Sequence, residues 1–402
     1  MPESLDGVRV LSFGAFVAGN TTGLMLAELG CDVLKIEARA RPEVLRQPAY
    51  AYGRAAAFEP SGVPQTYLYA GLSRSTRSLS LDCYTEEGRE LFRRLVAVTD
   101  VVVENFGMKV MAKWGCAFDD LRKINPRLVM LSISGYGRTG PRASYLGYGT
   151  NIASYVGMKH TWGVNHGTHF DYTASAHAVG SVVAALEQVR RTGEGVYIDV
   201  AQVDCAAAVQ APLYLEAMVN GNDPGYTGNE IADSPFAGVF RCAGVDAWLA
   251  LECEDLDDWR QLCEFLSRPD LIVSTEIDAA LQRPQLEAAL VEWLANQSKH
   301  TAAHLLQKAG LAAGAVAGNE DIYRDPHLRE RGFAVEIDQI DVGRYQYAQS
   351  AHRMSKTPGH IRRRGPRLGE HTDEVLRTWL DLADDEIDSY EAAGAIFRAP
   401  TS

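Results

Sequence analysis

Short apolar segments alternate with segments of helical character along the first half of the chain, and this alternation constrains the fold more than any other feature. The apolar segments are typical of buried strands, and the segments between them carry an apolar face or many small residues. Strands that alternate with helices form a parallel sheet covered on both faces. The expected strands are VRVLSF (8–13), DVLKIE (32–37), DVVVENF (100–106), RLVMLSISGYG (127–137) and GVYIDVAQ (195–202). The sequence therefore predicts an α/β fold.

The helical segments are expected at residues 19–30, 86–98 and 172–193. Asn20 or Thr21 is expected to cap the first of them, because a short polar side chain can accept from the free amides of a helix start. Proline and glycine are frequent in residues 211–235, which indicates a connection into a second domain.

Charge excludes some classes of partner. The 402 residues include 52 acidic and 39 basic side chains, a formal net charge of −13. Nucleic acids and anionic membranes attract a basic face, so neither is expected as a partner.

Seven scattered cysteines without a CxxC pair are typical of a reduced compartment. The N-terminal residues do not resemble a signal peptide, and no run of 18 apolar residues follows. A cytoplasmic protein is expected.

Two local patterns raise the question of a cofactor or a metal. The first turn, SFGAFVAGN (12–20), can cradle a phosphate with its backbone amides, but its two glycines do not form GxGxxG, so an NAD-dependent enzyme is not favoured. His160, His166, His169 and Asp171 lie within twelve residues. They lack the helical spacing of a metal site, so we expect a polar loop and no metal.

Three blocks follow one another along the chain: LDGVRVLSFGAFVAGNTTGLMLAELGCDVLKIEA, RSTRSLSLDCYTEEGRELFRRLVAVTDVVVENF and INPRLVMLSISGYGRTGP. With the later blocks RRTGEGVYIDVAQVD and GPRLGEHTDEVL, they resemble the class III coenzyme A transferase (CaiB/BaiF) family over essentially the whole chain. The resemblance implies a Rossmann-like large domain with a parallel sheet, a smaller α+β domain, and two chains interlocked as a dimer. The expected parts are 1–210 for the first part of the large domain, 225–325 for the small domain and 335–402 for the C-terminal return.

The resemblance also implies a coenzyme A thioester as substrate or ligand, with no tightly bound cofactor. Matched residue by residue, the family's motifs assign CoA binding to Val17, Ala18, Arg74, Arg77, Asn105 and Phe106. Arginine offers a fork of donors to phosphate, and an aromatic ring can pack on adenine. The chain reads GMK after ENF, where the family usually has Arg-Pro-Gly. This departure removes one cation from the implied site.

The decisive departure from the family lies in GYG, residues 147–149. Active transferases of the family have Gly-Tyr-Asp, and that aspartate attacks the acyl-CoA to form covalent intermediates. Gly149 has no side chain, so this position is a vacant nucleophile position. The racemase branch has histidine and aspartate there and a further acid later in the chain, near which Asp171 falls. The family's glycine-rich loop is expected near 230–238, but NEIADSPFAG (229–238) is not glycine-rich.

We therefore expect a subunit without a catalytic residue of its own, in an interlocked hetero-oligomer with a paralogous catalytic CoA-transferase subunit. The two-subunit succinyl-CoA:benzylsuccinate CoA-transferases resemble such a pairing. They suggest transfer of CoA from succinyl-CoA to an organic acid such as an aromatic succinate. Three alternatives stay open. The first is an active homodimeric acyl-CoA transferase and the second is a racemase-like enzyme, and either of these would use a displaced acid such as Asp171. The third is a regulator that binds acyl-CoA without turnover.

Overall fold

The computed structural model describes residues 3–50, 57–163, 168–223, 225–229, 231 and 234–400. The chain divides into two compact units. Unit 1 comprises Met1–His160, Val164–Pro224 and Glu330–Ser402, and unit 2 comprises Thr161–Gly163 and Gly225–Arg329. No helix in the described ranges is long and apolar enough to cross a bilayer.

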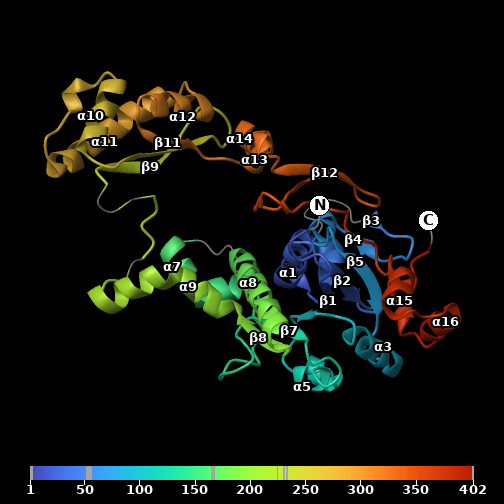
Figure 1. The fold of residues 1–402 in the computed structure, drawn as a ribbon. Coiled ribbons are helices and arrows are strands. Elements are labelled where there is room, and N and C mark those ends of the chain that lie inside the picture. Colours follow the sequence, from blue (N-terminus) through green and yellow to red (C-terminus); the bar gives the residue numbers. More distant parts are fainter. Residues whose placement is uncertain are drawn as a thin grey trace. The chain divides into compact units, whose positions relative to one another are not determined.

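Unit 1 is built on a seven-stranded sheet in the order β14-β5-β2-β1-β6-β7-β8. Neighbouring strands run parallel, except that β14 is antiparallel to β5. The strands are β1 (Arg9–Ser12), β2 (Asp32–Glu37), β5 (Arg77–Leu81), β6 (Val101–Glu104), β7 (Val129–Ser134), β8 (Val196–Ala201) and β14 (Ile396–Phe397). The central strands β1, β2, β6 and β7 have runs of buried aliphatic side chains, which are typical of strands covered on both faces. The predicted α/β fold with a large parallel sheet is confirmed (Figure 1).

Helices cover both faces of this sheet. On one face α8 packs against α1 and against β7 and β8, and on the other face α15 packs against α3 and β5. Because α15 and α16 belong to the last thirty-odd residues of the chain, its C-terminal end completes unit 1 beside β5 (Figure 1). These helices are α1 (Phe16–Glu28), α3 (Glu86–Val96), α8 (His169–Thr192), α15 (Thr372–Leu380) and α16 (Asp384–Ala392).

Local sequence explains where two of these helices begin and end. The Thr85 side chain accepts from the Gly88 amide at 3.0 Å and so caps α3. Acidic residues follow in its first turn and arginines stand in its last turn, which favours the helix dipole. α8 ends at Gly193, whose φ of 77° lies in the left-handed region that glycine adopts without strain.

The predicted cap of α1 is wrong. The helix begins at Phe16, so Asn20 and Thr21 lie inside it. The Asn20 amide donates to the Phe16 carbonyl at 2.6 Å and accepts from Lys35 Nζ at 2.6 Å. Lys35 is buried, and its need for acceptors explains why a polar side chain stands at this internal position.

Further elements of unit 1 lie outside the sheet. α9 runs through Pro212 and continues as a π-helical turn over Glu216–Asn220, so the first part of the predicted connection at 211–235 is helical. β3 pairs with β4 and β12 pairs with β13, each antiparallel. The bounds are α2 (Tyr67–Leu72), α4 (Val110–Lys113), α5 (Phe118–Leu121), α6 (Gly149–Tyr155), α9 (Gln202–Leu215), β3 (Ala57–Phe58), β4 (Pro64–Gln65), β12 (Ala334–Gln339) and β13 (Gly343–Ala348); α7 (Met158–Trp162) continues from unit 1 into unit 2.

Unit 2 is an antiparallel three-stranded sheet in the order β11-β10-β9 with helices packed on it. Trp259 lies at the centre of its core and donates from Nε1 to the Leu271 carbonyl at 2.9 Å. The elements are β9 (Phe236–Arg241), β10 (Trp248–Cys253), β11 (Ala312–Ala315), α10 (Leu256–Phe265), α11 (Glu276–Leu294), α12 (Lys299–Lys308) and α13 (Asn319–Arg324), with α14 (Pro326–Glu330) at the boundary with unit 1.

Candidate functional site

A cavity of about 700 Å³ lies in unit 1 where β1, β6, β7 and β8 end. The loops after β1 and β6 form one wall, and the loop after β7 with the start of α6 forms another. The next strand of the sheet along the chain, β2, pairs with one edge of β1, and β6 pairs with the opposite edge of β1. The order of the strands therefore reverses between β1 and β6. The cavity therefore occupies the topological switch point, where open α/β sheets bind their ligands.

The wall after β1 is a tight turn held by the strand beside it. A Cβ atom on Gly14 would lie 2.4 Å from the Gly19 carbonyl oxygen, so the turn requires glycine there. The Asn105 side chain accepts from the Ala15 amide at 2.8 Å and donates to the Ala15 carbonyl at 2.7 Å. Asn105 thus fastens the loop after β6 to the loop after β1, and its contact with CoA stays a prediction.

Phe16 adopts strained backbone geometry on this wall. Its φ of 54° lies in the left-handed region, which is unfavourable for a residue with a side chain. The Phe16 amide donates to Glu43 Oε1 at 2.8 Å, and its ring meets the Tyr148 ring edge-on at 5.3 Å. Strain of this kind concentrates at functional sites. Here it presents an aromatic ring to the cavity.

Gly149 lies on the opposite wall, as the first residue of α6. Just before it the backbone crosses the end of β7 closely, since a Cβ on Gly135 would lie 2.4 Å from the Gly147 Cα. The Tyr148 amide donates to Asn151 Oδ1 at 2.6 Å, which fixes the start of α6. The position of residue 149 is thus well defined, and it carries no functional group.

Asp171 lines the same cavity from the first turn of α8. Gln202 Nε2, directly after β8, donates to Asp171 Oδ1 at 2.6 Å. Burial raises the pKa of Asp171 to about 6, and the hydrogen bond from Gln202 opposes that rise. Among the described residues that line the cavity, Asp171 is the single carboxylate. The structure therefore brings Gly149 and a carboxyl group whose pKa is raised by burial to one cavity.

Arg138 is the one cation among the described lining residues. Its Nη2 donates to Glu104 Oε1 at 2.6 Å, and its backbone amide donates to Asp199 Oδ2 at 2.8 Å. Glu104 is buried at the end of β6 and also accepts from Ser132 Oγ. Sequence reasoning missed Arg138 and Gln202, although both follow parallel strands at the edge where ligands bind.

The predicted CoA-binding residues fall into two groups. Arg74 pairs with Glu28 at 3.0 Å, and Arg77 pairs with Asp32 and, at 2.9 Å, with Glu374. Neither arginine is among the described residues that line the cavity, and both guanidinium groups pair with carboxylates of unit 1. Their CoA-binding role therefore stays a prediction. The residues that do line the cavity are Val17, Ala18, Asn105 and Phe106.

The expected polar loop is wrong for the described members of the histidine cluster, because they lie on helices α7 and α8. His160 Nε2 lies 3.1 Å from Asp223 Oδ1, His169 begins α8, and His166 falls outside the described residues. In the part of the chain that the structure describes, no three His, Cys, Asp or Glu side chains gather as a metal site would require.

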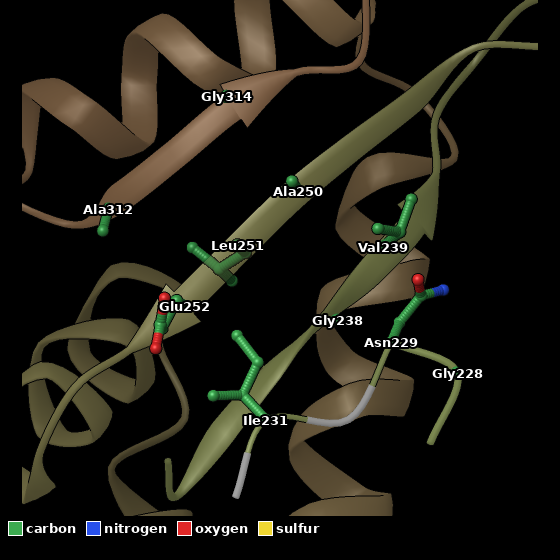
Figure 2. Close-up of a pocket in the computed structure, with 10 residues that line it drawn as sticks. All are labelled: Gly228, Asn229, Ile231, Gly238, Val239, Ala250, Leu251, Glu252, Ala312 and Gly314. Carbon is green, nitrogen blue, oxygen red and sulfur yellow. The ribbon is translucent and has the colours of Figure 1, made fainter. Parts of the chain in front are cut away.

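A separate cavity of about 360 Å³ lies on the sheet of unit 2 (Figure 2). Glycine, alanine and aliphatic side chains form most of its lining, and Asn229 and Glu252 are its polar side chains. No pair of titratable groups stands among these lining residues, so the chemistry is more readily sought in the cavity of unit 1.

With a partly polar cavity at the switch point of its parallel sheet, unit 1 is an α/β fold of the kind that binds ligands at this place. The sequence matches CoA-transferase family III over residues 5–372, and the chain belongs to that family. A solved structure of a CaiB/BaiF family protein from Brucella suis is 27% identical, with a TM-score of 0.83 over 93% of this chain and 99% of that one. The predicted family is confirmed.

Three relatives have stated activities. Succinyl-CoA–D-citramalate CoA-transferase of Chloroflexus aurantiacus is 27% identical over 98% of each chain. The beta subunit of succinyl-CoA–L-malate CoA-transferase from that organism is 30% identical over 98% of each chain. Succinate–glutarate CoA-transferase of Agrobacterium fabrum is 29% identical over 92% of this chain and 94% of that one.

Proposed function

We propose that this chain is a subunit of a class III CoA-transferase that moves CoA between succinyl-CoA and another organic acid. The relatives support this, because each is similar over nearly its whole length and transfers CoA to or from succinate. In this proposal CoA is a substrate and enters along the wall formed by Val17, Ala18, Asn105 and Phe106.

The observation that carries the proposal is the bare cavity wall at Gly149. A carboxylate nucleophile needs a side chain, and residue 149 has none. We assign the nucleophilic aspartate to a paralogous chain, and this chain is the non-catalytic subunit of a hetero-oligomer. The L-malate transferase of Chloroflexus aurantiacus, which has an alpha and a beta subunit, gives a precedent for two related chains in one enzyme.

Exposed apolar side chains on the end of α9 and the turn after it support a partner chain. Leu215, Met218 and Val219 are 58%, 82% and 76% exposed, and Val209 one to two turns earlier is half exposed. Soluble monomers rarely expose contiguous apolar patches of this kind. In the proposed interlocked hetero-oligomer, the paralogous subunit covers them.

The rim of the cavity supports an aromatic acceptor. Tyr145, Leu146 and Tyr148 line the cavity and are 59%, 71% and 50% exposed. Aromatic rings favour edge-to-face or offset contacts with another ring. An aromatic succinate would bring an apolar ring to this rim and a carboxylate to the interior.

A second function is favoured by the position of Asp171. A carboxyl group with a pKa near 6 in the cavity of Gly149 suits a displaced acid, in an active homodimeric transferase or a racemase-like enzyme. Asp171→Asn separates the two functions. A catalytic acid would cost about a hundredfold or more in rate. The non-catalytic subunit predicts that Asp171→Asn, like the exposed control Asp204→Asn, leaves transfer by the assembled complex nearly unchanged.

The direct test compares CoA transfer from succinyl-CoA by the purified chain alone and mixed with a paralogue that carries Gly-Tyr-Asp. Activity in the mixture and none from either chain alone supports the proposal. Activity from this chain alone contradicts it. Binding of acyl-CoA without transfer in any mixture would identify the chain as a regulator instead.

A further inference from the structure

We infer that Arg138 binds the free carboxylate of a dicarboxylic acyl group in the cavity, with Ser134 as a second donor. The inference rests on the proposed function, since it assumes that an acyl-CoA enters the cavity of this chain. It adds to that function the residue that recognises the dicarboxylic acyl group of a substrate such as succinyl-CoA.

The distribution of charge around the cavity supports this role for Arg138. The chain carries a net charge of −13, yet the described lining of the cavity holds a single cation, Arg138, and a single carboxylate, Asp171. A dicarboxylic acyl thioester keeps one ionised carboxylate at the end away from sulfur. A charge of this kind enters a partly buried cavity at a high cost unless a cation meets it. Arginine suits this task, because its planar fork matches both carboxylate oxygens.

Arg138 is held in place by its neighbours before any ligand binds. Gly137, with a φ of 79°, turns the chain after β7, and the Arg138 amide is fixed to Asp199 at 2.8 Å. One guanidinium nitrogen, Nη2, is fixed to Glu104 at 2.6 Å. Within the described residues, Nε and Nη1 donate to no protein atom, so they remain available to a ligand. A side chain anchored in this way loses little conformational entropy when a ligand binds.

Another lining residue of the cavity, Ser134, has a hydroxyl group without a hydrogen-bond partner in the part of the chain that the structure describes. Ser134 is the last residue of β7 and lines the cavity. Its Oγ is shielded from solvent and has no hydrogen-bond partner among the described residues. Buried hydroxyl groups are normally paired. A ligand carboxylate would accept from this hydroxyl and from the guanidinium together.

A purely structural role for Arg138 is the competing explanation, because Glu104 is buried and needs a cation. The two roles differ in what they predict for ligands. A structural cation supports the loop for every acyl-CoA equally. A cation that binds the acyl carboxylate discriminates between thioesters of equal length that differ in their terminal charge.

The experiment measures dissociation constants of succinyl-CoA and butyryl-CoA by isothermal titration calorimetry, on the full-length chain in the oligomer it forms. Arg138→Gln should weaken succinyl-CoA binding about tenfold or more and leave butyryl-CoA within about twofold. Arg142→Gln is the matched control, since Arg142 lies on the same loop, is exposed and donates to the Tyr155 hydroxyl at 2.9 Å. If Arg138→Gln fails to fold, Glu104→Gln combined with Arg138→Gln removes both charges and leaves no unpaired buried ion.

The outcomes separate this inference from the function on which it rests. Selective loss of succinyl-CoA affinity in the Arg138 variants supports it. Equal weakening of both thioesters, or a native chain that binds both equally, overturns it while CoA binding stands. If the native chain binds neither thioester, CoA binding by this chain fails as well, and both statements fall together.

Discussion

Replacing Asp171 by asparagine should change how the stability of this protein depends on pH. In the folded chain, burial raises the pKa of Asp171 from its ordinary value of 3.8 to about 6. Between these values the unfolded chain has released the proton and the folded chain has not. Ionisation therefore favours the unfolded state progressively as pH rises from about 4 to about 6, and the loss is complete above the folded pKa.

The size of the effect follows from the same two values. A difference of this size corresponds to about 3 kcal/mol, at about 1.4 kcal/mol for each tenfold change in proton affinity. The Asp171 carboxylate also lies in the first turn of α8, where a negative charge gains about 0.3–1 kcal/mol from the helix dipole. The burial cost is larger, so it determines the sign. The amide oxygen of the introduced asparagine would still accept from Gln202 Nε2, so Asp171→Asn should stabilise the fold by about 2 kcal/mol above neutral pH.

The measurement is denaturant unfolding of the native and Asp171→Asn chains from about pH 4 to about pH 7.5. The stability advantage of the variant should grow through this range and should be near zero at its acid end. Asp204→Asn is the control, because that carboxylate is exposed on α9 and solvated in both states. The prediction is refuted if the stability advantage of Asp171→Asn does not vary with pH, or if the variant is less stable than the native chain at neutral pH. Either result would mean that burial does not raise the pKa of the Asp171 carboxyl group.

Two further changes test how the cavity wall is built. Asn105→Ala removes two hydrogen bonds to the Ala15 backbone, so chemical denaturation should show a loss of about 2 kcal/mol; a loss below about 0.5 kcal/mol would mean that water replaces them. Gly14→Ala places a Cβ 2.4 Å from the Gly19 carbonyl oxygen and should lower stability by about 1–3 kcal/mol or more in thermal unfolding. Gly180→Ala, inside α8 with no atom within 4 Å of the added Cβ, should instead raise stability by about 0.5–1 kcal/mol, and equal effects of the two alanines would contradict the steric argument.

Much of the fold could be predicted from the sequence because its signals are local. A buried strand such as DVLKIE (32–37) is indicated by its apolar residues, and α3 is indicated by the helical periodicity of its apolar residues. The start of α1 could not be predicted, since Asn20 is satisfied by Lys35 from the neighbouring strand rather than by the helix end. Proline at 212 suggested a break, but α9 continues past it into a π-helical turn. In both cases a tertiary or rarer local arrangement outweighed the usual preference.

The site could be predicted in part. The turn after β1 and the ENF loop, which the motifs assigned to CoA binding, line the cavity together with Gly149 and Asp171, but their contacts with CoA stay a prediction. Arg74 and Arg77, which the resemblance assigned to CoA binding, both pair with carboxylates that are distant in the chain. The Arg138–Glu104 ion pair could not be predicted from the sequence, because it joins residues at the ends of two different strands. Such partners are defined by sheet order, which no local pattern encodes.

The most direct test of the central claim is to find which chain carries the covalent intermediate. The complex of this chain with its Gly-Tyr-Asp paralogue is incubated with succinyl-CoA, quenched, and each chain is weighed by intact mass spectrometry, followed by peptide mapping. We expect an adduct on the aspartate of the paralogue and an unmodified mass for this chain. An adduct on this chain, at Asp171 or at any other carboxylate, would show that it is a catalytic subunit and contradict the account.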